Sequence, residues 1–337
     1  MDLRDYAFVI ENLETSELMG SDSAIANIFL LQKKYNTKIH LYNNFLFREY
    51  FGEKNRSGFA FPLRLKEGSG SSHPYPSASA SDLKAALKTA IEHIFLLNST
   101  AANHNSTAKT KTFKTDVRFC LCTQTQKNLL DECFRNYFPS YKIDWKTTRD
   151  DSDYIYLREK LEKLSGSALQ KKKNHISQFM RAYENRWCFK LFPQNAIAED
   201  MLTVEENWFF ERSNDVEKAF DDKALQLERE SIKLALEHAS LFKMTGGVLY
   251  VDEKPVAMCL ASPVNELTLD IHFEKVMAQT ARNGGYAVIN NLFASQCKSY
   301  KFINREEDVG VEGLRKAKLS YKPEMLLEKF YGQVIKC

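Results

Sequence analysis

A repeated order of secondary structure restricts the fold of this chain more than any other feature of its sequence. Alternating hydrophobic residues and turn residues predict three strands, a helix, a strand, a second helix and a final strand in the later half. The earlier half predicts the same order, and a polar stretch, TTRDDSD, lies between the two. We therefore predict an α/β (α+β) protein of two units in tandem, residues 1–150 and 151–337. Each unit would be a mixed, mostly antiparallel sheet flanked by helices.

Length and composition agree with two compact domains. The 337 residues are 44% hydrophobic and 27% charged, which is typical of globular proteins. No stretch approaches the roughly 18 to 20 apolar residues of a membrane span, and charges lie too close to the N-terminus for a signal peptide. The seven cysteines are scattered without zinc-ligand spacing. We expect a cytoplasmic protein without a bound metal.

The net charge is only +3, so recognition of an anion has to depend on local clusters of bases. One such cluster is the run Lys171, Lys172 and Lys173. It lies in a helix predicted from residue 168 to about residue 184, with Ser167 and Gln170 as a capping box. Positive charge in the first turns opposes the helix dipole by roughly 0.3–1 kcal/mol for each lysine, a cost that an anionic partner would reverse. Alternatively, the lysine stems pack against the protein and their ammonium groups reach solvent.

A second candidate for anion binding is the turn RNGGYA, between an alternating strand and a helix. Glycines at such a turn let backbone N–H groups approach an anion, and the helix N-terminus adds partial positive charge. The pattern R-x-x-G-x-A therefore favours a pyrophosphate site made by Arg282, Asn283, Gly284 and Gly285. A glycine pair is also what any tight connection uses, so a plain turn is the alternative.

The segment NREEDVGVEGLRKAKLSY combines acids, glycines and bases. We predict a helix over residues 311–321, with an apolar face made by Val311, Leu314, Ala317 and Tyr321. Lys318 projects inside this apolar sector and Arg315 lies at its margin, and a buried base is costly unless it is paired. We expect these two bases and Arg305 to form a salt-linked framework with Glu306, Glu307 and Asp308. A purely structural ion network is the alternative.

Two titratable side chains share the polar face of the predicted strand ELTLDIHFEKV. Asp270 and His272 are two residues apart, so strict alternation turns both the same way. Histidine titrates near neutral pH, which suits it to accept a proton from an attacking amine or hydroxyl. The alternative is a strand histidine that faces solvent. No Ser-His-Asp signature suggests a covalent nucleophile.

The order of elements, with R-x-x-G-x-A opening the helix after the fourth strand, resembles the GNAT acyltransferase superfamily over about residues 187–334. In the earlier half the corresponding loop, RLKEGSGSS, lacks the arginine-led pattern R-x-x-G-x-A. The resemblance implies a donor site in residues 151–337 and a structural or acceptor-shaping role for residues 1–150. It also implies that Tyr321 occupies the region where many GNAT enzymes keep a tyrosine acid.

Two longer motifs are similar to one particular family. YIYLREKLEKLSGSALQKKKNHISQF, followed far downstream by NREEDVGVEGLRKAKLSYKP, resembles the family built around the phosphatidylglycerol lysyltransferase C-terminal domain (DUF2156 type). That family carries two GNAT-like units and transfers an aminoacyl group from charged tRNA to a lipid head group. This sequence lacks the membrane-spanning segments of the lysyltransferases.

The resemblance implies an acyltransferase in which an amine or hydroxyl acceptor attacks a phosphate-rich donor directly. The donor is either aminoacyl-tRNA or acyl-CoA, used as a co-substrate, with no tightly bound cofactor and no metal. The acceptor is a small molecule or a lipid head group. A base cluster that includes the lysine run, Arg315 and Lys318 would suit the phosphates of tRNA. A catalytically silent tRNA- or nucleotide-binding or assembly module is the alternative.

Overall fold

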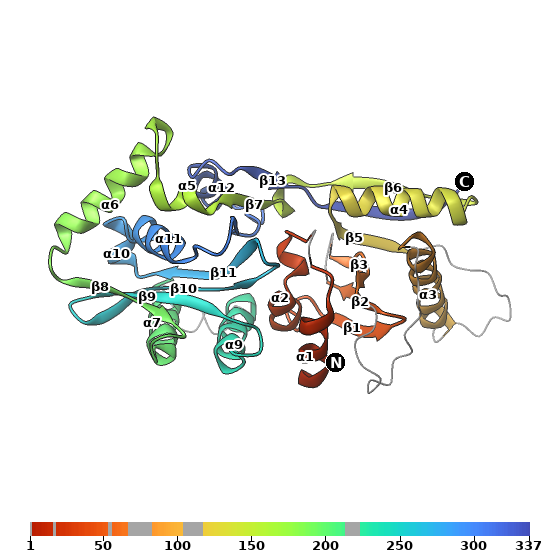
Figure 1. Ribbon diagram of the computed structural model, residues 1–337, viewed down its shortest axis with the longest axis horizontal. Helices are drawn as coiled ribbons and strands as arrows, with labels where there is room; N and C mark the ends of the chain where they lie inside the picture. Colours follow the sequence, from red (N-terminus) through yellow and green to blue (C-terminus); the bar gives the residue numbers. More distant parts are fainter. Residues whose placement is uncertain (1, 16–17, 53–55, 67–82, 104–116, 213–222) are drawn as a thin grey trace. The chain divides into compact units, whose positions relative to one another are not determined.

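A computed structural model describes residues 2–15, 18–52, 56–66, 83–103, 117–212 and 223–337 (Figure 1). The chain forms two compact units whose segments alternate along the sequence. The first unit consists of Met1–Glu14, Tyr35–Asp151 and Glu328–Cys337, and the second of Thr15–Lys34 and Ser152–Leu327. The predicted continuous domains, 1–150 and 151–337, are therefore wrong for residues 15–34 and 328–337. Part of the loop RLKEGSGSS lies outside the described residues.

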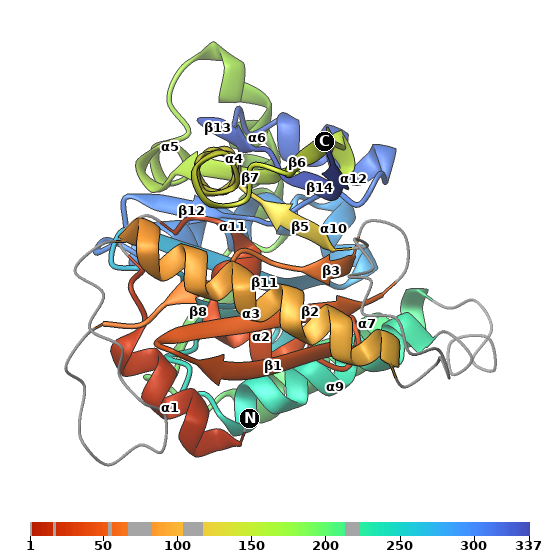
Figure 2. The same ribbon diagram turned by 90° about the vertical axis from the view of Figure 1, so that its right-hand side faces the viewer.

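The sheet of the first unit has the strand order β1-β2-β3-β5-β14-β6, with β4 paired to β2. Its strands are β1 (Thr37–Tyr42), β2 (Phe45–Phe51), β3 (Ser57–Phe59), β4 (Leu63–Arg64), β5 (Arg118–Cys122), β6 (Tyr141–Thr147) and β14 (Phe330–Lys336). Its helices are α1 (Leu3–Asn12), α3 (Leu83–Asn103), α4 (Gln124–Tyr137) and the short turn η2 (Arg149–Asp151). Helix α3 lies across β1, β2 and β3 (Figure 2), where Ile91 joins Phe47 and Phe119 in the core.

The sheet of the second unit has the order β13-β7-β12-β11-β10-β9-β8. Its strands are β7 (Asp153–Leu157), β8 (Trp187–Phe192), β9 (Thr245–Val251), β10 (Lys254–Pro263), β11 (Thr268–Val276), β12 (Phe302–Asn304) and β13 (Met325–Leu327). Among these described strands, β11 and β12 form the one parallel pair. The predicted fold class, two mixed sheets flanked by helices, is confirmed.

Helices cover both faces of this second sheet. Figure 1 shows α10 (Ala278–Arg282) and α11 (Gly285–Gln296) on one face, with α7 (Ala198–Arg212) and α9 (Lys223–Glu237) on the other. The remaining helices and turns are η1 (Ser21–Ser23), α2 (Ile25–Leu30), α5 (Arg158–Lys163), η3 (Ser167–Leu169), α6 (Gln170–Ala182) and α12 (Glu312–Leu319). No helix in the described ranges is both long enough and apolar enough to cross a membrane.

The two sheets repeat one pattern, as the element order predicts, but the first sheet takes one strand, β14, from beyond the predicted boundary. A parallel pair, β3–β5 or β11–β12, is followed by two antiparallel neighbours in both sheets. These neighbours are β14 and β6 in the first sheet, and β7 and β13 in the second. Strand β14 follows β13 along the chain, and β7 follows β6. The last strand of the later half, β14, therefore pairs in the sheet of the first unit, which explains why residues 328–337 belong to that unit.

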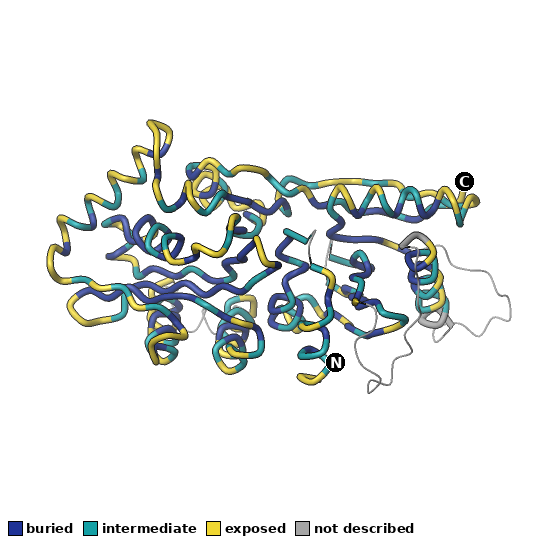
Figure 3. The backbone as a smooth tube through the Cα atoms, viewed as in Figure 1, coloured by how far each residue is buried: buried dark blue, intermediate teal, exposed yellow. Residues whose placement is uncertain are grey.

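Strand β11 contains a bulge at His272. Ala261 of β10 is paired with Ile271, whereas the preceding Leu260 is paired with Phe273, so His272 is the extra residue. A bulge of this kind changes which face the following side chains occupy. The predicted strict alternation is therefore wrong, and most of β10 and β11 is buried (Figure 3). No solvent-facing polar face remains in β11.

Candidate functional site

Arg305 lies just after β12, with its guanidinium beside two tyrosine rings. Its Nη2 donates a hydrogen bond to Glu274 Oε1 at 3.0 Å, and its Cζ lies 5.9 Å from the ring centroid of Tyr156 and 4.9 Å from that of Tyr321. Burial acts to lower the pKa of Arg305, but the Glu274 carboxylate together with Tyr156 and Tyr321 outweighs burial, and the pKa is raised. Nη1 of Arg305 is buried and has no hydrogen-bond acceptor in the part of the chain that the structure describes. This nitrogen can donate to a bound molecule.

Tyr321 forms one wall around Arg305. Its side chain is buried, and burial raises its pKa to about 12 although the Arg305 guanidinium acts in the opposite direction. The phenol therefore keeps its proton at neutral pH. Such a group is suited to donate a proton to a leaving oxygen.

The three predicted lysines of α6 separate into two groups. Lys172 is half-buried, and its Nζ lies 3.9 Å from the ring centroid of Tyr321. Burial, followed by repulsion from Arg305 and Lys171, lowers the pKa of Lys172 to about 8. Lys171 and Lys173 are exposed on the same helix. The lysine run thus places one base beside Tyr321 and two bases in solvent.

The start of α6 differs from the predicted capping box. The helix begins at Gln170 after the short turn η3, and no side chain caps its first N–H groups. Ser167 belongs to η3, which moves its hydroxyl away from the capping position. The first backbone N–H groups of α6 therefore have no side-chain acceptor, and they lie beside the positive charges of the lysine run.

Lys318 holds the segment after β12 through its main chain. Its Nζ donates to the carbonyl oxygen of Arg305 at 2.6 Å, to that of Glu306 at 3.2 Å, and to that of Glu307. Burial lowers the pKa of Lys318. The prediction that Lys318 pairs with the neighbouring carboxylates is wrong, because it binds their carbonyl groups. With three acceptors satisfied, Lys318 positions Arg305 instead of binding a donor.

Asp308 and Arg315 form the salt link that the sequence predicts. Arg315 Nε and Nη2 donate to the two carboxylate oxygens of Asp308 at 2.9 and 2.7 Å, and the Tyr154 hydroxyl donates at 2.5 Å. Burial acts to raise the pKa of Asp308, but these hydrogen bonds outweigh it, and the pKa lies well below its ordinary value. Arg315 is thus committed to fixing the loop. Arg305, which we expected in the same framework, pairs with Glu274 instead.

Only part of the predicted apolar face after β12 is buried. Val311, Leu314 and Ala317 are exposed, whereas Lys318 and Tyr321 are buried. The prediction of a buried apolar face is therefore wrong for Val311, Leu314 and Ala317. The carbonyl groups of the preceding loop attract Lys318 inward, and this orientation turns the apolar positions outward.

Packing explains the glycine turn without an anion. Gly284 has φ +94°, and a Cβ there would meet the carbonyl oxygen of His175 at 2.2 Å. The backbone of α6 thus occupies the side from which a pyrophosphate would approach Gly284. Asn283 Nδ2 donates to the Tyr183 hydroxyl at 2.8 Å, and Gln178 of α6 donates to the carbonyl of Arg282. The last glycine of the pair, Gly285, is the buried first residue of α11, and the exposed Arg282 side chain donates to Gln279.

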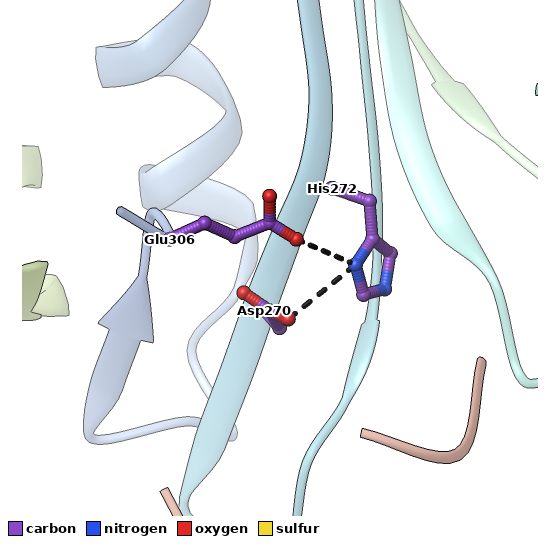
Figure 4. Close-up of side chains that lie close together, drawn as sticks. All are labelled: Asp270, His272 and Glu306. Carbon is purple, nitrogen blue, oxygen red and sulfur yellow. Dashed lines mark hydrogen bonds and ion pairs between the residues drawn. The ribbon is translucent and has the colours of Figure 1, made fainter. Parts of the chain in front are cut away.

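Asp270 and His272 lie in a different cluster from Tyr321. His272 Nε2 is 2.7 Å from Ser262 Oγ, and its Nδ1 is 3.4 Å from Asp270 Oδ2 and from Glu306 Oε1 (Figure 4). The side chains of Asp270 and His272 are at most 1% exposed. The predicted combination of Asp270, His272 and Tyr321 is not brought together. A substrate could not easily reach His272, because both ring nitrogens already have neighbours.

The sequence does not predict Ser262 as a neighbour of His272, because only strand pairing brings the two together. It lies on β10 directly opposite Asp270. In the sequence it is ten residues from His272 and belongs to no recognisable motif.

In each sheet a parallel pair of strands lies among antiparallel neighbours, and this arrangement is a GNAT-like fold, repeated in tandem. The chain belongs to the family described as phosphatidylglycerol lysyltransferase, C-terminal, whose model matches residues 102–332. Family and fold point to a transferase of the lysylphosphatidylglycerol synthase or GNAT acyltransferase type. The family predicted from the two sequence motifs is confirmed.

Known structures support the same fold over nearly the whole chain. A conserved protein of unknown function from Bacteroides thetaiotaomicron is 26% identical, with a TM-score of 0.75, and the match covers 98% of this chain and 97% of that one. The C-terminal domain (DUF2156) of a proposed lysylphosphatidylglycerol synthetase from Agrobacterium fabrum has a TM-score of 0.58 at 10% identity, covering 98% and 93%. L-PGS from Bacillus licheniformis has a TM-score of 0.57 at 13% identity, covering 98% and 91%.

A curated relative matches a smaller part. An uncharacterised protein of Mycoplasmoides gallisepticum is 28% identical over 205 residues, which are 58% of this chain and 62% of that protein. The match therefore spans less than two thirds of the relative's length.

Proposed function

We propose that the second unit transfers an aminoacyl group from aminoacyl-tRNA to an amine or hydroxyl acceptor. The observation that carries this proposal is that the three consecutive lysines of α6 have different surroundings. Lys172 lies against Tyr321, while Lys171 and Lys173 are exposed one residue to either side. The exposed Lys171 and Lys173 can therefore bind the phosphates of the donor. Lys172, between them in the sequence, can act as a base beside the acyl ester.

The packing of α6 favours tRNA over acyl-CoA as the donor. In the resemblance to GNAT enzymes, the pyrophosphate of CoA would lie against the turn at Gly284. The carbonyl oxygen of His175 lies against that glycine, and a carbonyl oxygen repels an anion. Helix α6 itself contains three consecutive lysines and Arg181 but no acidic residue, which suits a polyanion.

The chemistry follows from three groups around Arg305. In its neutral form Lys172 accepts the proton of the attacking amine or hydroxyl, whose lone pair forms the new bond to the acyl carbon. Arg305 Nη1 donates to the carbonyl oxygen as negative charge develops there. Tyr321 donates its proton to the ribose oxygen that leaves, and a proton from Lys172 restores the phenol afterwards.

The remaining predicted residues have supporting roles in this proposal. Lys318, Arg315 and Asp308 fix the segment that carries Arg305. Asp270 and His272 take no part in proton transfer. The acceptor is a hydroxyl or amine of a small molecule or lipid head group.

The test compares two donors with one protein. The full chain is mixed with radiolabelled aminoacyl-tRNA or acetyl-CoA and a panel of acceptors that includes phosphatidylglycerol vesicles, and label in the acceptor is measured. We expect transfer from the tRNA, and its loss by 10²- to 10⁴-fold in Tyr321→Phe. Transfer from acetyl-CoA alone would contradict the donor assignment. A parent protein that binds tRNA but transfers nothing to any acceptor would support the binding-module alternative.

A further inference from the structure

We propose that Asp270, His272 and Glu306, with the side-chain amide of Asn27, form a binding site for one Zn²⁺ ion. The four residues come from three separate parts of the second unit: α2, the bulged strand β11 and the segment after β12. The ligand atoms of the two acids and the histidine lie within 4.8 Å of one another. Figure 4 shows both carboxylates directed at the same ring nitrogen.

The distances fit a shared metal better than they fit hydrogen bonds. Nδ1 of His272 is 3.4 Å from an oxygen of each acid, whereas charged N–H···O hydrogen bonds are about 2.7–2.9 Å long. Two ligands about 2.1 Å from a tetrahedral zinc ion are separated by about 3.4 Å. Magnesium prefers octahedral geometry, in which adjacent ligands lie only about 3.0 Å apart. The observed spacing therefore favours zinc.

The second nitrogen of His272 has the partner that a metal-bound histidine requires. Nε2 and the Ser262 hydroxyl are 2.7 Å apart. If Nε2 carries the proton and donates it to Ser262, the lone pair of Nδ1 faces the two carboxylates. Metal-binding histidines are commonly oriented by such a hydrogen bond from their other nitrogen. Without a cation, a lone pair and two anions would repel one another at this point.

Asn27 supplies an independent indication. Its side chain is only 5% exposed and lies against the two acids, with Nδ2 2.9 Å from Glu306 Oε1 and 3.3 Å from Asp270 Oδ2. Its Oδ1 is buried and has no hydrogen-bond partner among the described residues. The oxygen and nitrogen of an amide exchange places by a rotation of the group. After that rotation the oxygen would face the two acids and also the Ser21 carbonyl oxygen, to which Nδ2 now donates at 3.2 Å, so this orientation would need a bound cation, which the oxygen would then coordinate.

A zinc ion bound here would also affect the position of Arg305 in the proposed donor site. Glu306 follows Arg305 directly, and its backbone N–H donates to Asn304 Oδ1 at 2.7 Å. An ion bound to Glu306, β11 and α2 would fix this segment on the face of the sheet opposite α11. Zinc would therefore stabilise the second unit and the position of Arg305 without contacting the acyl group.

The experiment measures zinc binding directly. The tag-free full chain is treated with a chelator, dialysed and titrated with ZnCl₂ by calorimetry, and thermal unfolding is recorded with and without the ion. We expect one Zn²⁺ per chain and a higher Tm with zinc. Asp270→Asn and His272→Asn should each weaken binding by at least 100-fold. Ser262→Ala, which keeps every ligand, should weaken it by 10- to 100-fold.

Asp252→Asn is the matched control, because it makes the same change at an exposed turn of the same unit. It should leave zinc affinity unchanged. If a ligand variant fails to fold, Co²⁺ absorption of the parent protein still tests the site. Visible bands without a thiolate charge-transfer band support oxygen and nitrogen ligands and exclude the exposed cysteines. Absence of zinc binding, or equal affinity in the parent, Asp270→Asn and Ser262→Ala, would overturn the proposal.

Discussion

The Nζ of Lys172 lies 3.9 Å from the ring centroid of Tyr321, and the same ring lies 4.9 Å from the guanidinium of Arg305. Two cations therefore share one phenol ring. Attraction of each cation by the ring offsets part of their mutual repulsion. Arg305 stays charged because Glu274 is bonded to it, so the repulsion acts on Lys172, which can lose its proton more easily.

Acyl transfer should rise with pH through the pKa of Lys172. Burial lowers this pKa to about 8, so the neutral base is scarce at pH 6.5 and predominant at pH 9. We expect the rate to increase up to about pH 8 and then level off. Lys172→Met should abolish this inflection and lower the rate by 10²- to 10⁴-fold. The pH profile of single-turnover transfer measures both effects.

The Lys172→Arg variant tests whether Lys172 acts as a proton acceptor or only as a positive charge. Arginine keeps the charge but does not release its proton in this pH range. We expect Lys172→Arg to be as inactive as Lys172→Met, while Lys171→Met retains the inflection. Substantial activity in the arginine variant would show that Lys172 acts only through its charge.

Substitution of Gly284 should destabilise the second unit strongly. Alanine at φ +94° costs about 1 kcal/mol for the backbone, and its Cβ would overlap the carbonyl of His175. Relief of such an overlap typically costs a further 1–3 kcal/mol. We expect Gly284→Ala to lower the free energy of unfolding by about 2–4 kcal/mol, measured by urea denaturation.

Gly166 provides the control for this substitution. It also has positive φ, +87°, but a Cβ there would meet nothing within 4 Å. Gly166→Ala should therefore cost only about 1 kcal/mol. If both variants lost the same free energy of unfolding, overlap with the His175 carbonyl of α6 would not contribute to the cost at Gly284.

Local sequence patterns predict the repeated element order, the lysines of α6 and the glycine turn. These features depend on residues close together in the chain. The pairing of β14 with β5 and β6 is different, because it joins strands that are far apart in the chain. The polar junction near residue 150 does not predict that pairing.

The two corrections at the site also have long-range causes. The sequence ELTLDIHFEKV alternates perfectly, yet His272 forms a bulge because of the register between β10 and β11. For α12, a helical wheel shows only that Lys318 interrupts an apolar face. The three carbonyl groups that bind Lys318 belong to a loop whose shape no wheel predicts.

Asp308→Asn should destabilise the protein in a pH-dependent way. The carboxylate is buried and accepts hydrogen bonds from Arg315 and Tyr154, and hydrogen bonds to charged groups contribute about 1.5–3 kcal/mol. We expect Asp308→Asn to lose about 1–3 kcal/mol at pH 7. The pKa of Asp308 is lowered in the folded state, so its contribution is complete above the unfolded value of about 3.9 and is lost as pH falls below it.

Unfolding by urea at pH 7, 5 and 3 tests this dependence. The difference between parent and variant should be constant from pH 7 to 5 and smaller at pH 3. The control is Glu312→Gln, which removes an exposed pair with Lys316 and should change stability by less than about 0.5 kcal/mol. A difference that grows towards low pH would contradict the assigned direction of the pKa shift.

Removal of the two exposed lysines of α6 should weaken tRNA binding and reduce its dependence on salt. Each phosphate contact that is lost reduces the magnitude of the slope of log K against log salt by roughly 0.7 to 0.9, so Lys171→Gln with Lys173→Gln should reduce it by about 1.4 to 1.8. The matched control is Lys223→Gln with Lys233→Gln, which removes two exposed lysines from α9 on the opposite face of the sheet (Figure 1). Both double variants carry the same net charge, so only the location of the lost charge differs. Equal slopes would mean that tRNA responds to net charge alone, whereas a reduced slope confined to the α6 variant would locate the phosphates beside Lys172.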